Sequence, residues 1–117
     1  MLKFLRYLAN QFTAHQYARE RSPKWESVRN KFVKDNPSCA LCGDKSGVEV
    51  HHVKPFHLFP ALELDPSNLI TLCRPHHLLA GHLMDWSSFN PTVREDCLIW
   101  RDKIRKRPQG VNNGIVQ

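Results

Sequence analysis

Four residues of the chain have the spacing of metal ligands. Cys39 and Cys42 are separated by two residues, and so are Cys73 and His76. Structural zinc takes four nitrogen or sulfur ligands in a tetrahedron, usually two from each of two tight turns. The sequence therefore predicts a structural zinc ion held by these four side chains. A redox-active Cys-x-x-Cys pair and unrelated buried thiols are the alternatives.

The remaining cysteine, Cys97, falls on the expected apolar face of a C-terminal helix and is interpreted as a small core residue. Charged residues interrupt the apolar N-terminus, so we expect no secretory signal peptide. In a reducing compartment, paired thiols favour metal binding over a disulfide. A chain of 117 residues builds a small core, and a bound zinc ion would add folding energy.

Three further histidines stand next to these ligands. His51 and His52 are adjacent in residues 48–53, which have the β-branched composition of a strand. Their side chains should therefore point to opposite faces of that strand. His77 follows His76 at the expected start of a helix, where consecutive residues differ by about 100° in direction. The spacing predicts a second, separate site made from His77 with His51 or His52.

The hydrophobic pattern indicates the elements that position these residues. Residues 54–67 contain three prolines and are interpreted as an irregular loop. Ser22 is expected to cap a helix, and Thr92 and Glu95 are expected to form a capping box at the start of another. The predicted elements are helices over residues 2–12, 22–36, 73–81 and 91–107, and strands over residues 48–53 and 68–72.

The formal net charge of +6 is concentrated at the two ends of the chain. Residues 1–37 carry eight Lys/Arg and three Asp/Glu, residues 38–92 carry three and five, and residues 93–117 carry six and three. Basic side chains neutralise phosphates and release counterions, so these flanks suit a nucleic-acid partner, with a generic basic surface as an equal alternative. The candidate DNA contacts are Lys24, Arg29, Lys31, Arg101, Lys103, Arg105 and Lys106.

In their order along the chain, these motifs resemble the signature of the HNH endonuclease family. The matching pieces are Cys39-x-x-Cys42, His51-His52, Asn68 and Cys73-x-x-His76-His77, which cover roughly residues 36–83. His76 stands where the common form of the family has cysteine, which leaves a Cys3His zinc set. The resemblance implies an α+β fold: a small ββα-metal (His-Me finger) core with a structural zinc site, flanked by N- and C-terminal helices.

The resemblance also implies a catalytic role for each matched residue. His51 and His77 correspond to ligands of a catalytic divalent ion, His52 to the general base, and Asn68 to the asparagine that tethers a loop and orients the base. A histidine pKa near 6.5 suits proton abstraction from water, and a divalent ion can bind the scissile phosphate. We expect Mg²⁺ or Mn²⁺ as this ion, with Ni²⁺ or Zn²⁺ as substitutes.

The other polar candidates have weaker sequence signals. His82 is a further candidate ligand, although it lies five residues after His77, which is unfavourable on an α-helix unless the chain bends. His15 and His57 are interpreted as bystanders. Glu63 is expected to be a solvated surface residue, with a supporting contact to a histidine as the alternative.

Together these observations predict a single-domain endonuclease that hydrolyses phosphodiester bonds of double-stranded DNA with low sequence specificity. The expected parts are a basic helical flank (1–36), the metal-binding core (37–90), a basic helix (91–107) and a flexible tail (108–117). The alternative is a non-catalytic zinc module that docks on nucleic acid or protein, for example as an accessory protein of a phage assembly. No run of 18 apolar residues occurs, so we expect no membrane span and a cytoplasmic protein of bacterial or phage origin.

Overall fold

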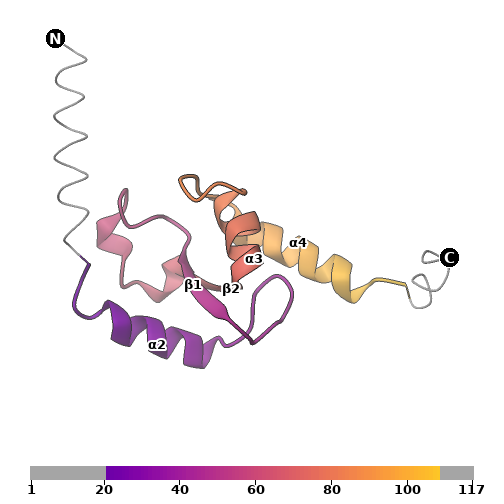
Figure 1. Cartoon of the computed structure of the whole chain (residues 1–117), viewed down its shortest axis with the longest axis horizontal. Helices are drawn as coiled ribbons and strands as arrows, with labels where there is room; N and C mark the ends of the chain where they lie inside the picture. Colours follow the sequence, from indigo (N-terminus) through magenta and orange to yellow (C-terminus); the bar gives the residue numbers. More distant parts are fainter. Residues whose placement is uncertain (1–20, 109–117) are drawn as a thin grey trace, which may run out of the picture.

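A computed structural model describes residues 21–108 of the chain (Figure 1). The predicted helix over residues 2–12 and residues 109–117 of the predicted tail lie outside the described residues. In chain order the elements are α2 (Trp25–Asp35), β1 (Val48–His52), the 3₁₀ turns η1 (Pro60–Leu62) and η2 (Pro66–Asn68), β2 (Leu69–Cys73), α3 (Arg74–His76), the π-helical turn η3 (His77–Gly81) and α4 (Val93–Arg105). This order confirms an α+β fold.

The two strands form an antiparallel hairpin. Val48 lies opposite Cys73, and His52 lies opposite Leu69, so the histidine pair sits at the end of β1 that meets the start of β2. All five residues of β2 are buried. The hairpin is followed directly by α3 and η3, and α2 and α4 flank it (Figure 1), as predicted for a ββα core between two helices.

A small hydrophobic core lies between the hairpin and α4. Leu72 and Val93 are fully buried within it, and Cys97 packs there with 1% of its surface exposed. This confirms Cys97 as a core residue. Two of the predicted zinc ligands, Cys39 and Cys73, belong to the same cluster. A core this small gives limited stabilisation, so its link to the ligand cluster matters for folding.

Helix α2 packs against β1 with a half-buried face that includes Trp25 and Phe32, and none of its residues is fully buried. It begins at Trp25, three residues after the predicted cap at Ser22. The hydroxyl of Ser22 accepts a hydrogen bond from the Lys24 amide, and its carbonyl accepts one from the Trp25 amide. Ser22 therefore opens a turn that precedes the helix. The helix ends before Asn36, as predicted.

The helix after β2 is regular only for its first three residues. α3 covers Arg74–His76, and the chain then widens into the π-helical turn η3, which ends at Gly81 as predicted. A π-helical turn pairs residues five apart instead of four and is often found at functional sites.

The capping box predicted at Thr92 and Glu95 is wrong, although α4 does begin after Thr92. The Thr92 hydroxyl bonds to the side chains of Asn90 and Asp96 and makes no cap to the helix backbone. Asn90 also accepts from the Thr92 amide and donates to the Ala80 carbonyl. Asn90 thus fixes the start of α4 and ties it to η3.

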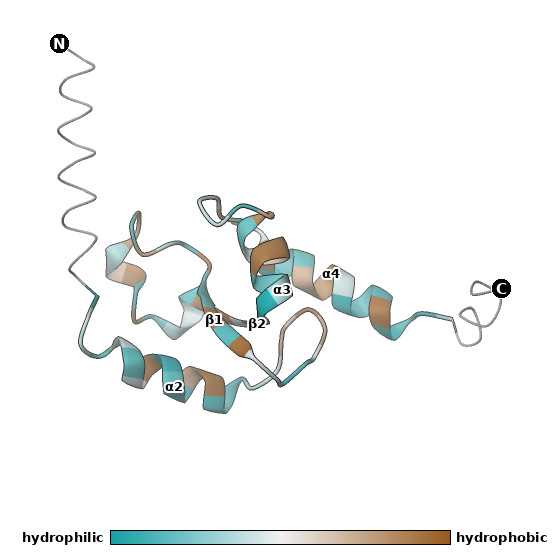
Figure 2. Cartoon of the chain, in the orientation of Figure 1, coloured by the Kyte–Doolittle hydropathy of each residue, from teal (hydrophilic) through white to brown (hydrophobic). Residues whose placement is uncertain are grey.

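Hydrophilic residues predominate along α2 and α4 (Figure 2). Beyond its buried first turns, α4 also exposes four apolar side chains, namely Leu98, Ile99, Trp100 and Ile104. None of the helices within residues 21–108 is long and apolar enough to cross a membrane.

Candidate functional site

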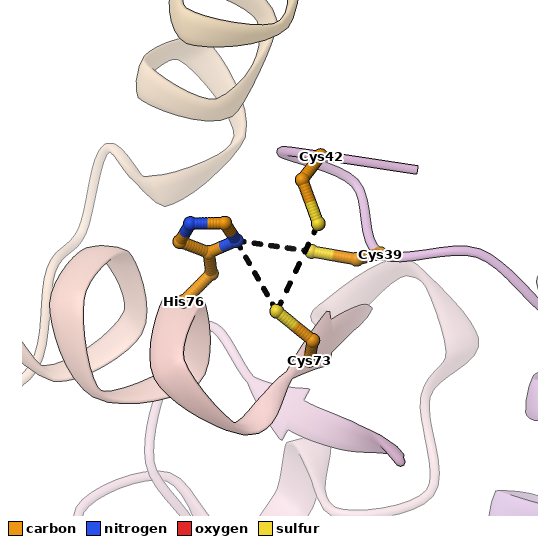
Figure 3. A group of neighbouring side chains, drawn as sticks. All are labelled: Cys39, Cys42, Cys73 and His76. Carbon is orange, nitrogen blue, oxygen red and sulfur yellow. Dashed lines mark hydrogen bonds between the residues drawn. The ribbon is translucent and has the colours of Figure 1, made fainter. Parts of the chain in front are cut away.

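The predicted zinc ligands converge on one point in space (Figure 3). Cys39 and Cys42 come from the turn before β1, while Cys73 and His76 come from the end of β2 and from α3. Their ligand atoms all lie within 4.8 Å of one another. All four cysteines of the chain are free thiols. The sequence prediction that these four side chains form one Cys3His cluster is therefore confirmed.

The spacing of this cluster suits a tetrahedral zinc ion. Ligands about 2.3 Å from a central zinc would lie roughly 3.8 Å apart along each edge of a tetrahedron. The Cys42 and Cys73 sulfurs are 3.9 Å apart, and the Cys39 sulfur is 3.7 Å from Nδ1 of His76. The third contact, from the Cys73 sulfur to the same nitrogen, is 3.2 Å. The donor set and the spacing both suggest a structural zinc.

The electrostatics of the cluster also favour a cation. Burial opposes ionisation of the Cys39 thiol, but backbone amides of Cys73, Cys42 and Leu41 donate to its sulfur and lower its pKa to about 6. Burial and the adjacent Cys39 raise the pKa of Cys73 to about 11. A second thiolate is thus unfavourable until a positive charge lies between the sulfurs, and a zinc ion supplies that charge.

A second cluster contains three histidines, none of them shared with the first. His51 comes from β1, and His77 and His82 come from the two ends of η3. Nε2 of His77 lies 3.0 Å from Nδ1 of His51 and 3.2 Å from Nε2 of His82. The predicted site made from His77 and His51 is therefore formed. His82 joins it because the π-helical turn brings residues five apart onto one face.

Hydrogen bonds behind the rings of His77 and His82 leave the inner nitrogens of these two residues without protons. Nδ1 of His77 lies 3.0 Å from the Glu49 carboxylate, and Nδ1 of His82 lies 2.7 Å from the Ser88 carbonyl. Both oxygens can only accept, so each ring donates from Nδ1 and keeps a lone pair on Nε2. Two lone pairs thus face each other at 3.2 Å. A metal ion would relieve this contact, so the three residues fit a divalent cation.

His51 contributes the most enclosed ring of the cluster. Burial and the neighbouring His77 and His82 lower the pKa of His51 to about 3, which keeps the ring neutral. Its Nε2 is buried and has no hydrogen-bond partner among the described residues. Gly81 lies against this ring, and a Cβ at position 81 would be 3.1 Å from the His51 Cε1 atom.

His52 points to the opposite face of β1, as the strand period predicts. Its Nε2 lies 2.9 Å from the backbone carbonyl of Glu63, and the Trp25 ring lies 4.5 Å from the His52 ring. The carbonyl can only accept, so Nε2 carries a proton and Nδ1 keeps the lone pair. Burial lowers the pKa of His52, the Glu63 hydrogen bond opposes this, and the charge of Arg21 lowers it further.

Glu63 is a buried residue, so its predicted solvation is wrong. Only 5% of its surface is exposed, because its carboxylate accepts from the Ser22 amide and forms an ion pair with Arg21. Its carbonyl, rather than its carboxylate, makes the contact to His52. Local sequence gave no signal for this burial, which depends on residues about 40 positions earlier in the chain.

Asn68 fixes the loop that carries Glu63. Its side-chain oxygen accepts from the Lys54 amide, and its Nδ2 donates to the carbonyls of Lys54 and Leu62. Leu62 directly precedes Glu63, so this clamp positions the carbonyl that holds His52. The predicted contact between Asn68 and a backbone turn beside His52 is present.

Comparison with family models places these two clusters in a known domain. The model of the HNH endonuclease family matches residues 39–82. This segment is an HNH endonuclease domain. It begins at the first ligand of the Cys3His cluster and ends at the last histidine of the second cluster. No curated protein and no solved structure matches the chain in the corresponding comparisons.

Three residues that support the histidine cluster of the HNH domain were missed by the sequence analysis. Glu49 binds His77 through its carboxylate and also pairs with Arg74 at 3.2 Å. The Arg74 guanidinium lies 4.3 Å from the centre of the Trp86 ring, which in turn contacts the rings of His77 and His82. Burial opposes ionisation of Glu49, but His77 and Arg74 lower the pKa of its carboxyl. Glu49 was detectable, since it lies two residues before His51 on the same strand face.

A cleft of about 840 Å³ opens beside the histidine cluster. Its lining includes His51, His77 and His82 together with His52. The wall is largely apolar, with the rings of Phe56 and Trp86 among its residues. His51 and His52, which lie on opposite faces of β1, therefore line the same cavity.

The basic residues predicted to bind DNA lie outside this cleft. On α2 and α4 most of them are exposed, and Lys31 and Lys106 form ion pairs with acidic residues one helical turn away. Lys103 lies over the Trp100 ring at 5.1 Å. The predicted residues before and on α2 are Lys24, Arg29 and Lys31, and those on or directly after α4 are Arg101, Lys103, Arg105 and Lys106.

Proposed function

We propose that this protein is a metal-dependent endonuclease that hydrolyses DNA phosphodiester bonds with low sequence specificity. The observation that carries the proposal is the cleft of the HNH domain, where the cluster of His51, His77 and His82 lies beside a fourth histidine, His52, whose tautomer is fixed. A structural zinc site alone would not require these four histidines.

In the proposed reaction, Nδ1 of His52 takes a proton from the attacking water. The water oxygen bonds to phosphorus, the bond to the 3′ oxygen breaks, and that oxygen takes a proton from solvent. The products are a 5′-phosphate and a 3′-hydroxyl. Asn68 and the Glu63 carbonyl keep the lone pair of His52 on Nδ1 until it accepts this proton.

His51, His77 and His82 would hold the catalytic divalent ion, Mg²⁺ or Mn²⁺ in the cell with Ni²⁺ or Zn²⁺ as substitutes. When bound, this ion supplies Lewis-acid stabilisation of the phosphate and the departing oxygen. Glu49 orients His77, and the Ser88 carbonyl orients His82. Cys39, Cys42, Cys73 and His76 would hold a separate structural zinc ion.

The DNA would be double-stranded, with the basic residues of α2 and α4 contacting phosphates on either side of the cleft. Contacts of this kind position DNA without reading its sequence, which accounts for the proposed low specificity. The division into flank (1–36), core (37–90), basic helix (91–107) and tail (108–117), and a cytoplasmic setting in a bacterium or phage, are part of this proposal.

The test is nicking of supercoiled plasmid with Mg²⁺, Mn²⁺ or EDTA, for the wild type and His52→Ala. We expect nicking that requires metal and falls by about 10²–10⁴-fold in the variant, since it removes the general base. Circular dichroism and zinc content serve as controls for folding. Equal nicking by both proteins would refute the role of His52. DNA binding without nicking under any metal would favour the non-catalytic zinc module.

A further inference from the structure

Arg21 is the one Lys or Arg among the described residues that line the cleft. It lies just before α2, in a position that the sequence analysis did not single out. A phosphodiester entering this cleft brings a negative charge next to His52. The seven basic residues predicted to bind DNA line no part of the cavity and therefore cannot neutralise that charge at close range.

The guanidinium of Arg21 is held on several sides. Its Cζ lies 4.8 Å from the centre of the Phe56 ring and 5.3 Å from that of Trp25, and Nη1 lies 3.5 Å from the Glu63 carboxylate. Stacking on aromatic faces together with an ion pair restricts a long side chain that would otherwise be mobile. Arg21 is thus a positioned cation, although about half of its side chain is exposed.

Two of these neighbours also hold the general base. The Trp25 ring packs against His52 at 4.5 Å, and the Glu63 carbonyl fixes Nε2 of His52. Arg21 and His52 are therefore oriented by the same pair of residues. Arg21 and His52 both line this cleft.

A guanidinium has five donors in one plane, and the Glu63 pair uses Nη1. The guanidinium carbon lies over the rings of Phe56 and Trp25, and its N–H groups point outward in the plane of the guanidinium. Two parallel N–H groups match two oxygens of a phosphate, which a lysine ammonium cannot do. The chemistry of this side chain therefore fits a phosphodiester better than a generic anion.

We propose that Arg21 binds the non-bridging oxygens of the scissile phosphate and neutralises the charge that builds on them during hydrolysis. This rests on the proposed function and extends it, because the active site then continues beyond the HNH match (39–82) to the residue that precedes α2. The segment that leads into α2 becomes part of the catalytic site, next to the basic flank.

The test uses bis(4-nitrophenyl) phosphate, a diester too small to reach the basic residues of α2 and α4 while bound in the cleft. Arg21→Ala should lower kcat by about 10²-fold, the loss typical of removing one charge-stabilising donor, with a smaller change in KM. Arg21→Lys should recover part of the rate. Lys34→Ala removes an exposed cation of α2 outside the cleft and should stay within about twofold of the wild type.

Free guanidinium separates binding of the phosphate from support of Glu63. At millimolar concentration it should restore part of the activity of Arg21→Ala and leave the wild type unchanged. A rate in Arg21→Ala equal to that of the wild type would overturn the proposal. So would a loss that neither guanidinium nor Arg21→Lys relieves, because it would assign Arg21 to holding Glu63 in the fold.

A binding measurement keeps this proposal distinct from the proposed nuclease activity. Diphenyl phosphate is titrated into ¹⁵N-labelled protein while the Nε–H resonance of Arg21 is followed by NMR. A saturable shift supports the phosphate site even if the wild type nicks no DNA, in which case only the nuclease proposal fails. An unchanged resonance at saturating diester would overturn the site while leaving the nuclease proposal standing.

Discussion

The Cys3His cluster and the histidine cluster are built from overlapping stretches of chain, but their surroundings differ. Two ligands of the first, Cys39 and Cys73, are part of the hydrophobic core. All three ligands of the second line the cleft. A structural zinc site is closed by four protein ligands, whereas a catalytic site keeps positions open for water and substrate. One segment of about 40 residues therefore provides a closed site and an open one.

Two adjacent residues, His76 and His77, divide the two clusters from each other. His76 contacts the sulfurs of Cys39 and Cys73, and the next residue, His77, contacts His51 and Glu49. Consecutive helical residues point about 100° apart, so the same turn can serve both clusters. The groups that hold the ligands also differ between the clusters. Backbone amides donate to the sulfur of Cys39, whereas the Glu49 side chain accepts from His77. The closed site should therefore govern folding, and the open site should govern activity.

The largest effect should come from breaking the closed site. Cys73→Ala removes a buried ligand, and structural zinc contributes on the order of 10 kcal/mol to folding in small zinc domains. We expect loss of bound zinc and of the cooperative unfolding transition, measured by metal analysis and by circular dichroism on heating. A folded, zinc-free protein would show that zinc binding at this cluster does not stabilise the fold.

Breaking the open site should have a different outcome. His77→Ala should keep one tightly bound zinc and a cooperative unfolding transition, because His77 lies outside the Cys3His cluster. Binding of Ni²⁺ to the zinc-loaded protein, measured by calorimetry, should weaken by at least about 10²-fold, since one of three ligands is lost. Loss of the structural zinc in this variant would contradict the separation of the two sites.

A smaller effect should follow from removing the support of a ligand. Glu49→Gln keeps the size of the side chain but weakens its hold on Nδ1 of His77. Removing such a partner typically lowers metal affinity by about 10–100-fold, so Ni²⁺ binding should weaken by that factor while zinc content is unchanged. Glu95→Gln, an exposed residue of α4, is the matched control and should bind Ni²⁺ like the wild type.

The smallest effect should come from the cysteine that belongs to neither site. Cys97→Ala removes one buried sulfur from the core and leaves all four ligands in place. We expect a loss of about 1 kcal/mol in the free energy of unfolding, measured with urea, and one zinc per chain as before. A drop in zinc content would show that Cys97 contributes to the closed site.

Local spacing was sufficient to predict the closed site and the hairpin. The ligand pairs lie in tight turns, and the strand period separates His51 from His52, so short-range rules determine their directions. The strand ends differed from prediction by one residue, with β1 ending at His52 and β2 at Cys73. Asn68 was identified together with its contact to a backbone turn.

The features that were missed depend on contacts between distant segments. His82 was uncertain because a π-helical turn cannot be read from an α-helical period. Glu63 was expected to be solvated, yet Ser22 and Arg21 bury it from another part of the chain. The capping box failed because Asn90 competes for the Thr92 hydroxyl. In each case tertiary structure overrides the local pattern.

The contact between Gly81 and His51 has a consequence for motion. The His51 ring lies flat against a backbone that carries no side chain, with 3.1 Å to the position where a Cβ would be. A side chain at position 81 would press on this ring, so glycine is the residue that leaves the ring its place. Because only 2% of the surface of His51 is exposed, the ring is enclosed before any ion arrives, and metal binding costs little further side-chain entropy at this residue.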